Sequence, residues 1–336
     1  MNIAARTRPA AARGFERRFN SLSVIFIGVA ATLWATDAYF RNQLVQHLSP
    51  TEIVLLEDGL ITLCLLPVLV IRRRELANLD RRGWLATIAI AFGAQSLATV
   101  MFTASFAYRN FAETYVLQQT QPLIAVALAG VVLGERRRPL FWPVLVLAVA
   151  SVYMVIFASN PTQPVAALQH GRLPAALLAL GAAALWAAGT VLGRMVLARV
   201  SFPTMTALRV TLALPLLLAI VMVGEGPAGL THYRPGDLPD FVGIALIPGL
   251  FALLLYYRAL ASTPASISTI AELAYPVAAT LIASAPAPWG FAQPLYPVQV
   301  VGTVLLIAAI GFFNWANLTG HAVAGRRRLT PRPLPD

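Results

Sequence analysis

The chain of 336 residues is 58% hydrophobic and only 12% charged, with a mean hydropathy of +0.71. Soluble globular domains carry about 25% charged residues, so this composition excludes an ordinary water-soluble protein. The formal net charge of +11 does not indicate nucleic-acid binding, because all 25 basic residues are arginines that lie mostly between apolar runs or at their ends.

Apolar runs of about 20 residues, the length that crosses a hydrocarbon core of about 30 Å, recur along the whole chain. The first run follows five arginines, but its length and the many runs after it favour a signal-anchor helix over a cleaved signal peptide. The sequence predicts an all-α integral membrane protein with ten transmembrane helices, at 22–40, 51–71, 84–108, 112–133, 140–158, 174–197, 202–223, 241–260, 265–284 and 295–316.

Arginine is distributed unevenly between the two sides of this predicted bundle. Twenty arginines lie at the termini and in or beside alternate loops, and four lie in the other loops. Cytoplasmic loops carry the excess of basic residues in membrane proteins. We therefore expect a multi-pass protein of the inner membrane with both termini in the cytoplasm, which requires an even number of crossings.

An internal repeat is visible at an offset of 154 residues, the distance from Pro122 to Pro276. A repeat of five helices must place its second copy upside down. The arginines agree, because 134–138 is strongly basic whereas its counterpart at 285–293 is uncharged. Inverted repeats of this kind are typical of secondary transporters.

The predicted organisation has two basic cytoplasmic tails, two five-helix repeats and one linker loop. In chain order these are the N-terminal tail 1–20, the first repeat 21–158, the linker 159–173, the second repeat 174–318 and the C-terminal tail 319–336.

Three segments, 102–135, 251–276 and 207–209, resemble signatures of the EamA-like family, the ten-helix form of the drug/metabolite transporter superfamily. The first two resemble the two copies of its fourth-helix signature, and the third resembles its arginine-bearing seventh helix. The resemblance implies a secondary transporter that exports its substrate. The residues that carry it are Ala112, Gln121, Pro122, Leu133, Gly134, Glu135, Ala207, Leu208, Arg209, Tyr256, Tyr257, Ala259, Leu260, Tyr275 and Pro276.

Two stripes of polar residues lie on the fourth and ninth predicted helices. Each stripe has the spacing i, i+4, i+7, which places its members on one helix face, and the stripes correspond at the 154-residue offset. Polar side chains are costly in lipid and therefore indicate function. Either the stripes line a midplane cavity that binds substrate, or they form hydrogen bonds that hold helices together. The members are Thr114, Gln118 and Gln121, and Ser268, Glu272 and Tyr275.

Glu272 is the one acid in these stripes. It either exchanges a proton, because burial favours the neutral form of a carboxyl group, or forms an ion pair with Arg209, which is predicted at a similar depth. Gln95 and Tyr257 are further candidates for the cavity lining, with interhelical hydrogen bonding as the alternative.

Two tryptophans, Trp34 and Trp186, lie well inside their predicted helices, 152 residues apart. They either stack on an aromatic or cationic ligand or pack in the bundle. Four acids, Asp37, Glu57, Asp58 and Glu113, fall in the half of the membrane away from the cytoplasm. They form either an acidic vestibule that attracts cations and zwitterions or helix-end residues that reach the interface.

The sequence favours a secondary transporter, by resemblance an exporter, of a small polar organic metabolite such as an amino acid. The alternatives are an intramembrane enzyme or a lipid-head-group flippase acting on lipid-linked substrates. Because there is no phosphate-binding loop, and Cys64 and four scattered histidines offer no metal site, we expect no enzyme activity, no cofactor and no metal. The expected partners are the substrate, the bilayer and, as a candidate coupling ion, the proton; the sequence does not indicate an oligomeric state.

Overall fold

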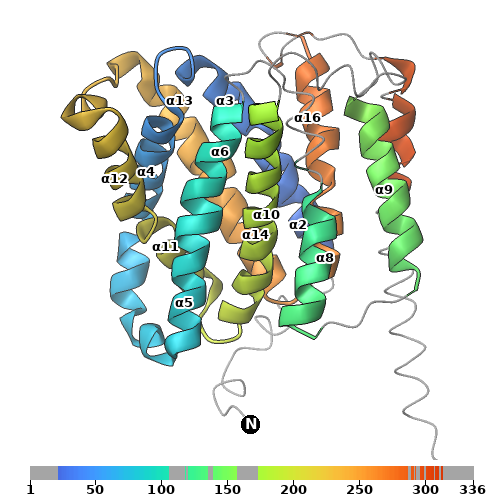
Figure 1. Ribbon diagram of the computed structural model, residues 1–336, viewed down its shortest axis with the longest axis horizontal. Helices are drawn as coiled ribbons and strands as arrows, with labels where there is room; N and C mark the ends of the chain where they lie inside the picture. Colours follow the sequence, from blue (N-terminus) through green and yellow to red (C-terminus); the bar gives the residue numbers. More distant parts are fainter. Residues whose placement is uncertain are drawn as a thin grey trace, which may run out of the picture.

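The computed structural model describes residues 22–105, 120–134, 139–156 and 173–286, together with Gln118 and several positions between 289 and 312. All of the described secondary structure is helical, so the all-α prediction is confirmed. The helices stand side by side in one bundle, with α12 (Leu214–Gly224) at one edge and α9 (Phe141–Ile156) at the other (Figure 1).

The elements follow one another along the chain with short connections. The first half contains α2 (Ser23–Ala35), α3 (Asp37–Leu44), α4 (Pro50–Ile71), η2 (Arg73–Asn78), α5 (Arg81–Ala89), η3 (Ile90–Leu97), α6 (Ala98–Ser105), α8 (Gln121–Val132) and α9. The second half contains α10 (Leu173–Val196), α11 (Phe202–Thr211), α12, η6 (Gly226–Leu230), η7 (Pro235–Asp237), α13 (Leu238–Ile244), η8 (Ala245–Phe251), α14 (Ala252–Leu260), α15 (Ala265–Ala271) and α16 (Ala274–Ser284). Of the η elements, η3 and η8 are π-helices and the others are 3₁₀-helices.

Six helical stretches in the described part of the chain are long and apolar enough to cross a membrane. The other predicted membrane helices correspond to shorter described helices, so ten crossings stay a prediction. The tails 1–20 and 319–336 and nearly all of the linker 159–173 lie outside the described residues. The six stretches are Ser23–Leu44, Pro50–Ile71, Arg81–Ser105, Leu177–Val196, Phe202–Gly224 and Pro235–Leu260.

The first helices of the two predicted repeats, α2 and α10, run in opposite directions. Ser23, at the start of α2, accepts a 2.8 Å hydrogen bond from Thr263. Arg194, near the end of α10, donates a 2.7 Å hydrogen bond to the carbonyl of Leu260. The start of one helix and the end of the other therefore lie beside the same short segment, which is the arrangement that inverted repeats require.

The two halves of the chain interlock through these same helices. Helix α2 packs against α14 and α16 of the second half, and α10 packs against α6 and α8 of the first. Helix α10 is rich in alanine and glycine, and small residues let membrane helices approach closely. Its residues Ala179, Ala182, Ala183 and Ala187 are fully buried in consequence.

One end of the bundle, which we call the arginine-rich end, holds the last turns of α4 and α10 and the first turns of α2, α5 and α11 (lower end in Figure 1). Here Glu75 accepts 2.8 Å hydrogen bonds from the backbone N–H of Ser201 and the hydroxyl of Thr204. Burial raises the pKa of Glu75, but hydrogen bonds from Ser201, Thr204 and Arg72 outweigh it and lower the pKa from 4.5 to about 2. A carboxylate of the first half therefore caps the N-terminus of α11 in the second half.

A second contact closes the same end, because Asp80, which caps α5, also forms an ion pair with Arg199 after α10. At the opposite end Glu52 lies 2.6 Å from His232, and His47 lies 3.0 Å from Asp237. Polar contacts therefore join the two halves at both ends of the bundle.

The arginine-rich end gives a testable orientation. We expect a reporter fused after Arg328 to be active only in its cytoplasmic form, because basic loops stay on the cytoplasmic side. Paired fusions to an enzyme that is active in the cytoplasm and to one that is active outside it measure this directly. Activity of the external reporter at that position would contradict both the orientation and an even number of crossings.

Candidate functional site: a cavity between the two halves

A cavity of about 150 Å³ lies in the interior of the bundle, and both halves of the chain line it. Six of the eight predicted substrate-binding residues lie at its wall. The lining residues are Trp34, Asp37, Arg41, Glu57, Thr99, Phe102, Gln118, Gln121, Trp186, Pro248, Gly249, Leu253, Glu272 and Tyr275.

Two helix breaks bring the polar stripes together in this cavity. Gln121 is the first residue of α8, and Glu272 lies between α15 and α16. Gln121 donates a 2.8 Å hydrogen bond to one carboxyl oxygen of Glu272, and Gln118 donates one of 3.2 Å to Gln121. The hydroxyl of Tyr256 donates to the other oxygen of Glu272 at 2.9 Å. Interrupted helices that present polar groups are a common way to build a binding site within a membrane.

The remaining members of the stripes are less exposed to the cavity or lie outside the described residues. Tyr275 lines the cavity, whereas Ser268 is fully buried and is not among the lining residues in the described part of the chain. Thr114 falls outside the described residues, as does Glu113 of the predicted acidic vestibule.

Aromatic rings form two walls of the cavity. Trp34 packs against Tyr256 with ring centroids 5.0 Å apart, and Trp186 packs edge to face against Phe102, also at 5.0 Å. Trp34 and Trp186 are the tryptophans at equivalent positions of the two predicted repeats. Each is held by a ring behind it and presents a broad apolar surface to the cavity.

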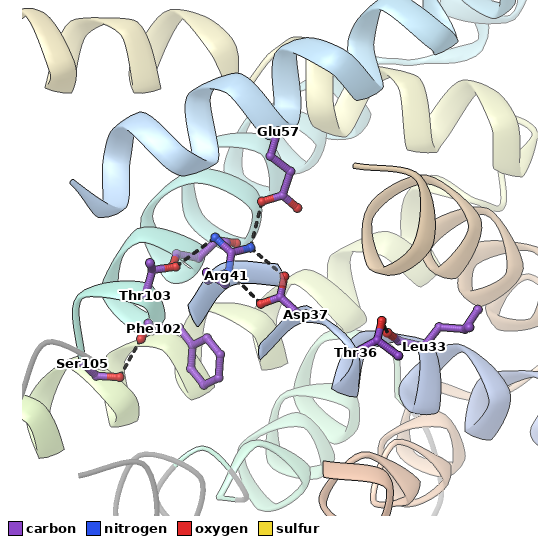
Figure 2. Close-up of polar contacts among 9 residues, drawn as sticks. Leu33, Thr36, Asp37, Arg41, Glu57, Phe102, Thr103 and Ser105 are labelled. Atoms are coloured by element: carbon purple, nitrogen blue, oxygen red, sulfur yellow. Dashed lines mark hydrogen bonds and ion pairs between the residues drawn. The ribbon is translucent and has the colours of Figure 1, made fainter. Parts of the chain in front are cut away.

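A buried ion cluster forms the polar side of the cavity. Arg41 is 2% exposed and donates to both carboxyl oxygens of Asp37, at 2.7 and 2.8 Å. It also donates to Glu57 at 2.8 Å and to the hydroxyl of Thr103 at 3.3 Å (Figure 2). Two of the predicted vestibule acids therefore share one arginine, which neutralises part of their charge.

Three other predicted residues, Gln95, Arg209 and Tyr257, form a separate network. Arg209 donates to the side-chain oxygen of Gln95, to the hydroxyl of Tyr257 at 2.8 Å and to the carbonyl of Ala94 at 3.3 Å. None of the three is among the described residues that line the cavity. The network instead joins η3 of the first half to α11 and α14 of the second.

Arg209 and Glu272 make no direct ion pair in the described part of the chain. Each uses other partners, and the link between them passes through the neighbouring residues Tyr257 and Tyr256. Their rings meet edge to face at 5.4 Å. Similar depth in the membrane therefore does not bring the two charges into contact here.

Sequence reasoning missed Arg41 and Phe102 as lining residues. Arg41 was counted as a loop residue because the apolar run ends at position 40, but α3 continues to Leu44. The spacing of four residues from Asp37 to Arg41 was the available signal, since such pairs meet on one helix face. Phe102 carried no comparable signal, because an apolar aromatic residue in a membrane helix is unremarkable.

Comparison with known proteins identifies relatives of the whole chain. Residues 21–157 and 173–315 each match the EamA-like transporter family. The riboflavin transporter ImpX of Fusobacterium nucleatum subsp. nucleatum is 27% identical over 297 residues, which are 85% of this chain and 95% of that protein. A protein of known crystal structure superposes with a TM-score of 0.67 at 16% identity, over 86% of this chain and 94% of that one, and so shares the fold.

Proposed function

Because the chain belongs to the EamA-like transporter family, we propose that it is a secondary transporter of a small polar organic metabolite that works by alternating access around the cavity. It is a multi-pass membrane protein and not an enzyme. In the proposed mechanism the two inverted five-helix repeats rock about the site that lies between them. The family resemblance favours export across the inner membrane, with both termini in the cytoplasm.

The observation that carries the proposal is the pairing of Trp34 and Trp186 at one cavity. One tryptophan comes from each half of the chain, and both line the same space. A planar ring gains contact area and favourable stacking between such aromatic walls. We therefore place a flat heteroaromatic ring first among candidate substrates.

The polar wall suits the edge of such a ring. Gln118 and Gln121 offer amide donors and acceptors, and Glu272 offers carboxyl oxygens beside them. Amides recognise groups that alternate donors and acceptors, as the edge of a heterocycle does. The site thus combines apolar walls with a few converging polar groups, which is the usual composition of a small-molecule site.

Riboflavin is the first substrate to test, because a relative that matches most of this chain is a riboflavin transporter and riboflavin joins a flat ring system to a hydroxylated chain. An amino acid with an aromatic side chain is the second. A lipid-linked substrate, as a flippase would move, is the third, and its long chains would have to leave the cavity between helices.

Exchange in proteoliposomes tests the proposal. Purified protein is reconstituted, the vesicles are loaded with riboflavin, and release is followed by its fluorescence when riboflavin or a competitor is added outside. We expect release above that of protein-free vesicles. Equal release from vesicles with and without protein, for riboflavin and for the amino acids alike, would contradict transport of small polar metabolites.

We expect Gln118→Ala and Gln121→Ala each to slow riboflavin exchange by about threefold to tenfold, the effect of losing one hydrogen bond. Gln46→Ala is the matched control, because Gln46 is exposed and bonds only within α3 and its continuation. Melting temperatures in detergent should stay within those of the control. Unchanged exchange in both variants would show that the two glutamines serve helix packing alone.

A further inference from the structure

Asp58, in the middle of α4, is a buried acid to which the proposed substrate site assigns no role. It is 0% exposed, and its neighbour Glu57, not Asp58, is among the described residues at the cavity wall. One carboxyl oxygen accepts a 2.7 Å hydrogen bond from Gln95. The other has no hydrogen-bond partner within the described residues. A single donor does not replace the hydration of an ionised carboxylate, which can accept about four hydrogen bonds.

The charges around Asp58 do not compensate a second negative charge. Glu57 stands next to it on α4, and Arg41 on α3 already contacts two carboxylates. The described parts of α6, α12 and η8, which also pack near α4, carry no charged residue, and α13 carries Asp240. The remaining cation is Arg209 on α11.

Arg209 approaches Asp58 only through the amide of Gln95. The amide nitrogen donates to Asp58, and the amide oxygen accepts from Arg209. The other described partners of Arg209 are a phenol and a backbone carbonyl, so no carboxylate contacts it directly. In this arrangement Asp58 is better accommodated as a neutral acid that holds its proton on the oxygen without a partner.

Glu272 differs from Asp58 in this respect. Both of its carboxyl oxygens accept a hydrogen bond, from Tyr256 and from Gln121. Two donors at 2.8 to 2.9 Å suit an ionised carboxylate. Of the two acids, Asp58 is therefore the one whose surroundings call for a proton.

The relay Asp58–Gln95–Arg209 crosses between the halves of the chain. Asp58 and Gln95 belong to the first matched segment, 21–157, and Arg209 and its partner Tyr257 to the second, 173–315. Any movement of one half against the other changes the separation of the acid from the arginine. We propose that Asp58 binds and releases a proton as the halves move and so couples transport to the proton gradient.

The proposed step is a simple proton release. When the halves bring Arg209 against Asp58, the O–H bond of the carboxylic acid breaks, the proton passes to water on one side, and Arg209 becomes the counter-ion of the carboxylate. When they separate, a proton from the other side restores the neutral acid. Since this scheme rests on the proposed transport function, it needs one test with a substrate and one without.

The test with a substrate compares riboflavin flux in proteoliposomes for wild type and Asp58→Asn. Both should exchange riboflavin at similar rates without a gradient, because asparagine resembles the neutral acid in shape. A gradient of one pH unit should change riboflavin accumulation by up to about tenfold per coupled proton in wild type and leave it unchanged in Asp58→Asn. Asp240→Asn, near the end of α13, is the matched control and should respond like wild type.

Three results would overturn the coupling role: a pH response that survives in Asp58→Asn, a wild type that exchanges riboflavin without responding to pH, or a wild type driven by a sodium gradient instead. The test without a substrate is infrared spectroscopy of the purified protein near neutral pH. We expect the C=O band of a protonated carboxyl group in wild type and Asp240→Asn and its loss in Asp58→Asn. A band that persists in Asp58→Asn would overturn the proton site, whereas absent riboflavin exchange in wild type with the expected infrared result would count against the substrate alone.

Discussion

Replacing Arg41 with leucine is expected to lower the free energy of unfolding by about 3 to 5 kcal/mol, the usual cost of removing one member of a buried ion group. Arg41 is 2% exposed and makes direct contacts with Asp37 and Glu57. Leucine would leave two carboxylates close together in the interior without a cation. Their desolvation and mutual repulsion both favour unfolding.

Thermal melting in detergent measures this effect. The triple variant Asp37→Asn, Arg41→Leu, Glu57→Gln should recover much of the loss, because it removes the stranded charges as well as the arginine. Arg73→Leu is the matched control at an exposed position of η2, and such surface changes usually stay within about 0.5 kcal/mol. If Arg41→Leu melts like this control, the cluster does not hold α3 and α4 together.

The second large effect is expected at Gly189, where α10 of the second half meets η3 of the first. A Cβ atom on Gly189 would come too close to the Cβ of Ala94, which has no rotamer by which to move away. Gly189→Ala therefore forces the two halves apart at this crossing. We expect a loss of about 1 to 3 kcal/mol, the range for overpacking a tight core.

Gly59→Ala is a control with the same chemical change. A Cβ on Gly59, in the interior of α4, would meet no atom within 4 Å. There alanine should be neutral or stabilising, since glycine is the weaker helix former by up to about 1 kcal/mol. Equal melting temperatures for the two variants would show that the halves tolerate separation at Gly189.

The sequence predicted the helices and the polar stripes well because both leave a periodic record. Apolar length locates a membrane helix, and the i, i+4, i+7 spacing put Gln118 and Gln121 on one face, where they line the cavity with Glu272. The break predicted at Pro248 and Gly249 coincides with the π-helix η8. Each of these features depends on neighbours along the chain.

Features that depend on how helices turn toward one another were not predictable. Arg209 and Glu272 have similar depths by residue count, but the direction of each side chain around its helix axis decides its partner. Arg209 turns toward Gln95 and Tyr257, and Glu272 turns toward Gln121 and Tyr256. In the same way, the cluster of Asp37, Arg41 and Glu57 depends on α3 continuing beyond the apolar run.

The two π-helices bear on the ancestry of the chain. η3 begins at Ile90 and η8 at Ala245, 155 residues apart, nearly the offset that relates the two halves elsewhere. The simplest history is that a single five-helix unit already carried this wide turn before its gene was duplicated and fused. Such a unit would have paired with an oppositely inserted copy of itself, so it had to enter the membrane in either direction. The arginine bias differs between the halves, and it therefore arose later than the π-helices, when each copy had settled into one orientation.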